Sequence, residues 1–203
     1  MIILDLVLVP PCICFPVLYH VYLWHNKNTS HHRTSSTTWF AKISKEKERG
    51  GSLLGAQSIR NSVMSSILNA MVTVIVIGAL ASLSNIVYTT GGPLHRPMLF
   101  GFKTSGTLVL FKYGMVMLLF LASFVFNSIA VGCVNDANFL LSADDYSFQS
   151  YAEVVMEKGS IFASVGNRLF YIGFPFLMWL FGPTALSLSM LAMIWVLYNL
   201  DFK

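Results

Sequence analysis

Two arginines stand at the edges of apolar stretches and could together bind an anion. Arg60 precedes one long apolar stretch and Arg168 precedes another, and amide side chains lie close to both in the sequence: Gln57, Asn61 and Asn167. Because the paired N–H groups of arginine match phosphate and carboxylate oxygens, this set could bind an anionic lipid or another anionic ligand. We favour the simpler explanation, in which both arginines mark the cytoplasmic ends of membrane-spanning helices.

Two aspartates could bind a cation. Asp5 and Asp201 lie at the outer ends of the first and last apolar blocks. If both reach the same membrane face, their carboxylates could share one cation, although solvation at a helix end is their expected role. Only Asn69 and Asn127 come deep within an apolar block. A transporter of charged solutes usually carries an acidic residue or an arginine inside the membrane, so the pattern argues against a proton-coupled pump.

The sequence contains no motif that is typical of an enzyme. It has no G-x-S-x-G, no H-E-x-x-H and no glycine-rich phosphate loop. Cys12 and Cys14 would diverge on a helix, and the pair His31-His32 has no third metal ligand nearby. We therefore expect no enzymatic activity, no bound metal and no cofactor.

The composition is that of a membrane protein. Of the 203 residues, 55% are apolar and only 11% are charged, and the mean hydropathy is +0.66. In a soluble domain, by comparison, about 25% of the residues are charged. The net charge of +4 does not indicate a nucleic-acid partner, because seven of the thirteen Lys and Arg residues lie between Lys27 and Arg60, between two apolar blocks. The predicted partner is a lipid bilayer.

The apolar blocks predict an all-α fold, a polytopic bundle of transmembrane helices that forms one membrane domain over residues 1–203. A helix of about 20 apolar residues crosses the hydrocarbon core, which places about four spans at residues 2–24, 63–84, 107–131 and 169–200. The last block is too long for one straight span. We expect it to form a single span that is kinked at Gly182-Pro183, rather than a hairpin.

The polar segments between the blocks have different expected roles. Residues 26–51 are basic and are predicted to form a cytoplasmic loop. Residues 144–158 alternate apolar and charged side chains at helical spacing, which predicts an amphipathic helix lying along the membrane surface and interrupted at Gly159. Lys112 stands one or two turns into the third span, and we expect its side chain to extend to the lipid headgroups.

Small residues recur at helical spacing in the second span. They are Ser62, Ser66 and Ala70, followed by Gly78 and Ser82. Small side chains allow a second helix to approach closely. Packing between helices is therefore their expected purpose, and association of several copies of the chain is an alternative that the pattern leaves open.

The distribution of basic residues predicts the orientation. The segments after the first and third spans carry most of the Lys and Arg residues, and such segments stay on the cytoplasmic side. With four spans, both termini are then expected on the non-cytoplasmic side. The default location is the plasma membrane or another membrane of the secretory route.

A series of short motifs gives the chain a resemblance to a known family. The motifs are Leu4-Asp5-Leu6, Tyr19-His20 with Trp24, Gln57 with Arg60-Asn61, Asn135 with Asn138-Phe139, Gly166-Asn167-Arg168-Leu169-Phe170-Tyr171, Gly182-Pro183 and Tyr198-Asn199-Leu200-Asp201-Phe202. In their order and spacing, the motifs resemble the plant proteins of the domain of unknown function 599 family over nearly the whole chain. The resemblance implies a four-span plant membrane protein and brings no established activity.

Two classes of function fit these patterns. In the first, the chain is a non-enzymatic membrane component that acts through helix packing and through contacts of its basic loop with lipids or partners. In the second, it is an oligomeric channel or facilitator for a small solute, with broken helices lining the path. Four spans are few for a transporter, and we rank the first class ahead.

Overall fold

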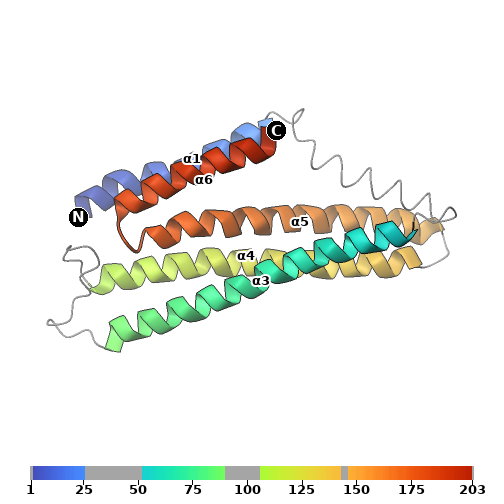
Figure 1. Ribbon diagram of the computed structural model, residues 1–203, viewed down its shortest axis with the longest axis horizontal. Helices are drawn as coiled ribbons and strands as arrows, with labels where there is room; N and C mark the ends of the chain where they lie inside the picture. The colour runs from blue at the N-terminus through green and yellow to red at the C-terminus, as the bar shows by residue number, and fades with distance from the viewer. Residues whose placement is uncertain (1, 26–51, 90–105, 143–145, 203) are drawn as a thin grey trace. The chain divides into compact units, whose positions relative to one another are not determined.

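The computed structural model describes residues 2–25, 52–89, 106–142 and 146–202, which form five helices. Helices α1 (Ile2–His25), α3 (Ser52–Thr89), α4 (Gly106–Ser142), α5 (Tyr146–Met178) and α6 (Pro183–Phe202) follow one another along the chain (Figure 1). No strand occurs in these ranges, and the predicted all-α fold is confirmed. The predicted loop 26–51 lies outside the described residues.

Three of the helices are long and apolar enough to cross a membrane. The candidate spans are Gln57–Thr89 in α3, Leu108–Leu140 in α4 and Ser150–Met178 in α5. Two shorter apolar stretches, Val9–Tyr19 and Pro183–Asn199, lie in α1 and α6. These helices indicate a multi-pass membrane protein, while the number of spans stays a prediction.

The last apolar block forms a hairpin, which corrects the prediction of one kinked helix over residues 169–200. Helix α5 ends at Met178 and α6 begins at Pro183, and the carbonyl of Met178 accepts hydrogen bonds from the N–H groups of Phe181 and Gly182, at 3.1 and 3.3 Å. Gly182 has a φ of +153°, a backbone conformation that residues other than glycine rarely adopt. Pro183 starts α6, where its missing N–H costs nothing. Helix α6 therefore turns back from α5 (Figure 1).

Helix α5 is continuous through Gly159, which corrects the prediction of a separate helix over residues 144–158. Gly159 is buried, and a Cβ there would lie 3.0 Å from a methyl group of Val134 and 3.1 Å from the Cβ of Cys133. The glycine thus allows α4 and α5 to approach closely instead of breaking the helix. Residues 146–158 are the first turns of a long helix.

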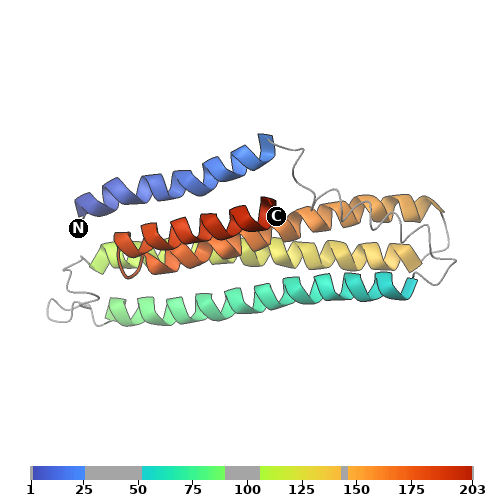
Figure 2. The same ribbon diagram turned by 45° about the horizontal axis from the view of Figure 1, so that its top comes forward.

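Contacts divide the chain into two compact units, and the three long helices contribute to both. The first unit contains Met1–Thr29, Val74–Leu121 and Leu169–Lys203, and the second contains Ser30–Thr73 and Ala122–Arg168. In the first unit, α1 packs against α6, and the two helices run in the same direction (Figures 1 and 2). Phe120, fully buried, lies at the centre of its core and meets Phe170 and Phe174 edge to face.

The core of the second unit is built from small and medium side chains. Ala137 on α4 and Ala152 on α5 have no exposed surface, and Ile59 of α3 packs against the same cluster. Small residues let helix backbones come close together, which is how helices associate where water supplies no driving force. The expected packing role of small residues holds for Ser66, which is buried, whereas Gly78 and Ser82 are exposed.

Candidate functional site

The second unit contains a layer of polar residues contributed by all three long helices. We call it the polar layer. Its members are Asn69 and Thr73 on α3, Ser123 and Asn127 on α4, and Gly166 and Asn167 on α5. Thr73, Ser123 and Asn127 have no exposed surface at all. A buried polar layer inside apolar helices is the most chemically distinctive feature of the described residues.

Each asparagine of the polar layer lies nine residues from one charged residue of its own helix, although Asn167 also has Arg168 as its direct neighbour. The three pairs are Asn69 with Arg60, Asn127 with Asp136 and Asn167 with Lys158. Helices α3 and α5 run in one direction and α4 in the other (Figure 1), so all three intervals start from the same end. Nine residues cover about 14 Å, close to half of a hydrocarbon core of about 30 Å. If the charged residues mark its edge, the layer lies near mid-depth.

Two hydrogen bonds join α5 to its neighbours within the layer. The Nδ2 of Asn69 donates to the Oδ1 of Asn167 at 2.7 Å, and the Oγ of Ser123 donates to the carbonyl of Gly166 at 2.8 Å. The hydroxyl of Thr73 instead donates to the carbonyl of Ala70 in its own helix, at 2.6 Å. The layer therefore fixes the register of α5 against both α3 and α4.

Asn127 has a satisfied amide nitrogen and an unsatisfied amide oxygen. Its Nδ2 donates to the carbonyl of Ser123 at 3.0 Å and to the Oγ of Ser123 at 3.4 Å. Its Oδ1 is buried and accepts no hydrogen bond from any group of the described residues. This assignment of the amide is the favourable one, because exchanging O and N would place Oδ1 against the Ser123 carbonyl oxygen. A buried acceptor without a donor costs about 1–3 kcal/mol.

Gly166 is the point at which α5 touches the Asn127 side chain. A Cβ on Gly166 would lie 2.6 Å from the Nδ2 of Asn127 and 3.1 Å from its backbone nitrogen. Real side chains do not approach so closely, and backbone cannot move aside as a flexible side chain can. Glycine is thus the residue that lets Asn127 face α5.

The structure separates the two arginines of the anion hypothesis. Arg60 is exposed on α3, nine residues before Asn69, while Arg168 is half-buried on α5, next to Asn167. Since Asn69 and Asn167 are hydrogen-bonded, Arg60 and Arg168 stand about 14 Å apart along the helices. Asn167 faces Asn69, and the two remaining residues of the predicted set, Gln57 and Asn61, are exposed beside Arg60. The binding of one anion by all five residues stays a prediction.

The structure also separates the two aspartates. Asp5 stands near the start of α1 and Asp201 near the end of α6, and their side chains lie outside the description. Because α1 and α6 run in the same direction (Figure 2), the two residues stand at opposite ends of the helix pair. The shared cation site stays a prediction, because neither side chain is described. It rested on one kinked last span, which would have returned Asp201 to the side of Asp5.

Lys112 is buried, which corrects the expectation that its side chain extends to the headgroups. Only 3% of Lys112 is exposed, and its Nζ lies 5.0 Å from the centre of the Trp179 ring in the first unit. A cation over an aromatic face is attracted by the negative charge density of the ring. The interaction holds the turn between α5 and α6 against α4.

Removing the hydrogen bond between Asn69 and Asn167 should show a coupling energy of about 0.6 kcal/mol, the average measured for hydrogen bonds between membrane helices, and at most about 1.7 kcal/mol. We expect Asn69→Leu and Asn167→Leu each to weaken the fold, and the double variant to lose less than the sum of the two. Unfolding by a denaturing detergent measures all four free energies. Asn85→Leu, at an exposed position of α3, should show no coupling with Asn167→Leu. If the double variant Asn69→Leu/Asn167→Leu lost as much free energy of unfolding as the two single variants together, the hydrogen bond would be contradicted.

A family model described as "Protein of unknown function, DUF599" matches residues 7–203 of the chain. No match was found among the curated proteins or among the solved structures. Within the described residues, no group of three or more His, Cys, Asp and Glu side chains is arranged to hold a metal ion.

Proposed function

The chain belongs to the DUF599 family of proteins of unknown function, and on that premise we propose that it is a non-enzymatic membrane component that acts through contacts of its helices with lipids and partner proteins. One observation carries this proposal: large apolar side chains run in exposed stripes along α3 and α6. The stripes follow helical spacing, and their members are between 53% and 73% exposed: Met64, Leu68, Met71 and Ile75 on α3, and Leu188, Leu191, Trp195 and Tyr198 on α6.

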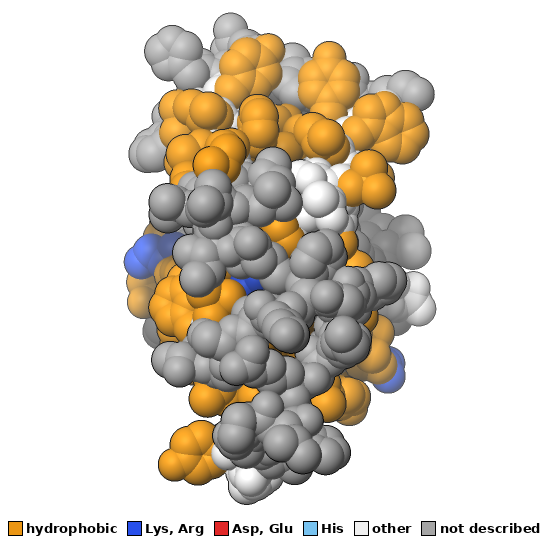
Figure 3. Space-filling view, turned by 90° about the vertical axis from the view of Figure 1, so that its left-hand side faces the viewer, with side chains coloured by type: hydrophobic (Ala, Val, Ile, Leu, Met, Phe, Trp, Pro, Cys, Tyr) orange, Lys and Arg blue, Asp and Glu red, His pale blue; other side chains and the backbone are white. Residues whose placement is uncertain are grey.

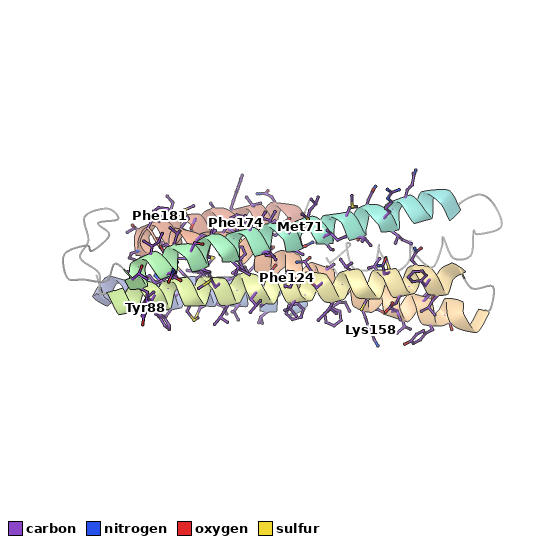
Figure 4. The ribbon with its side chains drawn as sticks, turned by 90° about the horizontal axis from the view of Figure 1, so that it is seen from below. Met71, Tyr88, Phe124, Lys158, Phe174 and Phe181 are labelled. Atoms are coloured by element: carbon purple, nitrogen blue, oxygen red, sulfur yellow. The ribbon has the colours of Figure 1, made fainter. Side chains whose placement is uncertain are left out.

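The stripes have the properties of surfaces that face lipid or another transmembrane helix. Figure 3 looks onto one end of the helices, where hydrophobic side chains make up most of what is described. Met71, labelled in Figure 4, belongs to the stripe on α3 and is 58% exposed. A continuous apolar surface of this kind marks an interaction site when it faces water, whereas a bilayer covers it at no cost. No catalytic chemistry is needed to account for it.

We further propose five crossings of the membrane, with the C-terminus in the cytoplasm. The hairpin at Gly182 and the common direction of α1 and α6 support it, because two helices that run in the same direction through a bilayer end on the same side. The segment 26–51, which follows α1, is basic and is retained on the cytoplasmic side by the positive-inside rule. The end of α6 then lies on that side as well, next to the anionic lipids that the basic segment would contact.

The experiment that tests the first function attaches a photo-crosslinker at Met71 and at Leu191 in the native membrane. We expect adducts with lipid, with a partner protein or with both, and no protein-dependent solute leak when the purified protein is placed in liposomes. Asn127, fully buried, is the matched control position and should give no intermolecular adduct. A solute flux that depends on the protein, without adducts at the two stripes, would contradict the proposal.

A second candidate function is facilitated passage of a small solute, which the polar layer favours. Arg168 is the only charged residue between Gly159 and Met178 and stands halfway along that stretch, beside Asn167. Polar and charged residues at mid-depth are expensive and often mark a path for solutes. A single copy offers few helices for such a path, so this function would require an oligomer. Liposome flux that is lost in Asn69→Leu and kept in Met71→Leu would support it.

A further inference from the structure

We propose that the Oδ1 of Asn127 binds a buried water molecule inside the second unit. This site would exist under either proposed function, since it depends only on the hydrogen bonding of the polar layer. Asn127 has no exposed surface, and its Oδ1 accepts no hydrogen bond from the described residues. Buried acceptors in folded proteins almost always have a donor, and a buried water supplies it where the chain does not.

The hydroxyl groups of the polar layer have no hydrogen left to donate to the Oδ1 of Asn127. The hydroxyl hydrogen of Ser123 is directed to the Gly166 carbonyl, and that of Thr73 to the Ala70 carbonyl. Asn69 directs one of its two amide hydrogens to Asn167. The two hydroxyl donors of the layer are therefore committed to other acceptors, and no amide hydrogen of the described residues reaches Oδ1.

The Asn127 amide cannot rotate to bring its Oδ1 to another donor. Its Nδ2 is held by the carbonyl of Ser123 at 3.0 Å, and Gly166 closes the space beside it. Because Asn127 has no exposed surface, only a very small molecule can stand beside its Oδ1. The six members of the layer include no charged side chain, and an uncharged donor fits such surroundings better than an ion does. Water has the required size, polarity and hydrogen-bond donors.

Isotope-edited infrared spectroscopy of the purified full-length protein tests the proposal directly. With labelled asparagine, the carbonyl band of Asn127 is identified as the band that Asn127→Leu removes. We expect it at the lower frequency of a hydrogen-bonded carbonyl, both before and after extensive exchange into solute-free buffer. A band at the frequency of a free carbonyl would overturn the proposal. A band that moves there during the exchange would assign the donor to a co-purified polar solute and would also overturn it.

The thermal midpoint gives a second readout with a predicted sign. Replacing an unsatisfied acceptor by an apolar group of similar shape should be neutral or stabilising, whereas replacing one that binds water removes a favourable bond. We expect Asn127→Leu to lower the unfolding midpoint by about 4 °C or more. Asn199→Leu is the matched control, because the Nδ2 of Asn199 donates to the Trp195 carbonyl at 2.9 Å in the same local arrangement. A midpoint for Asn127→Leu at or above that of the control would contradict the water site.

Discussion

Replacing Phe120 with alanine should lower the free energy of unfolding by about 3–5 kcal/mol, the largest effect we expect from a single change. Phe120 has no exposed surface, and its ring centre lies 6.2 Å from those of Phe170 and Phe174, in edge-to-face contacts. Gly173 faces the same ring, because a Cβ there would lie 2.7 Å from the ring tip. The alanine variant would leave a cavity between α4 and α5 that no neighbour can fill without moving a helix.

Thermal unfolding in detergent, followed by the loss of the monodisperse species, measures this effect. For a chain of this size, 1 kcal/mol corresponds to about 2–4 °C, so the midpoint should fall by about 10 °C. Phe111→Ala is the matched control, because Phe111 lies on the same helix and is 61% exposed. A fall of equal size in both variants would show that the core of the first unit is not organised around Phe120.

Replacing Gly166 with alanine should destabilise the fold by about 2 kcal/mol, the typical cost of overpacking. Alanine is intrinsically the better helix former by about 1 kcal/mol, so a simple propensity argument predicts the opposite sign. The added Cβ would meet the amide and the backbone nitrogen of Asn127, at 2.6 and 3.1 Å, and α4 and α5 would have to separate. The hydrogen bond from Ser123 to the Gly166 carbonyl would lengthen as a result.

Gly132→Ala provides the matched control for this change. Gly132 lies on α4, is exposed, and has no atom within 4 Å of an added Cβ. Unfolding by a denaturing detergent should show an unchanged or increased stability for Gly132→Ala and a decrease for Gly166→Ala. If both alanines stabilised the protein equally, the close approach of α5 to Asn127 would be wrong.

Composition and apolar blocks were sufficient to predict an all-α membrane protein, and they also identified the two deep asparagines, Asn69 and Asn127. What they could not supply was the partners of these residues. Asn167 sits 98 residues from Asn69, and nothing in a single sequence links the two. Gly166 could have been suspected, since a glycine inside an apolar helix often marks close packing.

The helix ends were harder to predict because glycine has two opposite uses. Gly159 was interpreted as a break, yet it permits close contact with α4, while Gly182 ends the hairpin turn with a positive φ. Both residues look alike in sequence. The length argument for one kinked span also failed, because α5 begins at Tyr146, within residues 144–158 that the charge pattern had assigned to a surface helix.

The environment of Lys112 illustrates a further limit. Its position near the start of an apolar block predicts the depth of the side chain but not its neighbours. Trp179 is 67 residues further along the chain. Because α5 runs opposite to α4 (Figure 1), the end of α5 brings its ring to 5.0 Å from the Lys112 ammonium group. The side chain of Lys112 is therefore buried over the Trp179 ring instead of extending toward the lipid headgroups.

The hairpin and the topology that follows from it are tested most directly by glycosylation mapping of the C-terminus. An acceptor site is added after Lys203 in one version of the protein and within residues 90–105 in another. Five crossings predict that the acceptor in residues 90–105 is glycosylated and that the one after Lys203 is not. Glycosylation of both would place the C-terminus on the non-cytoplasmic side and would contradict the five-crossing arrangement.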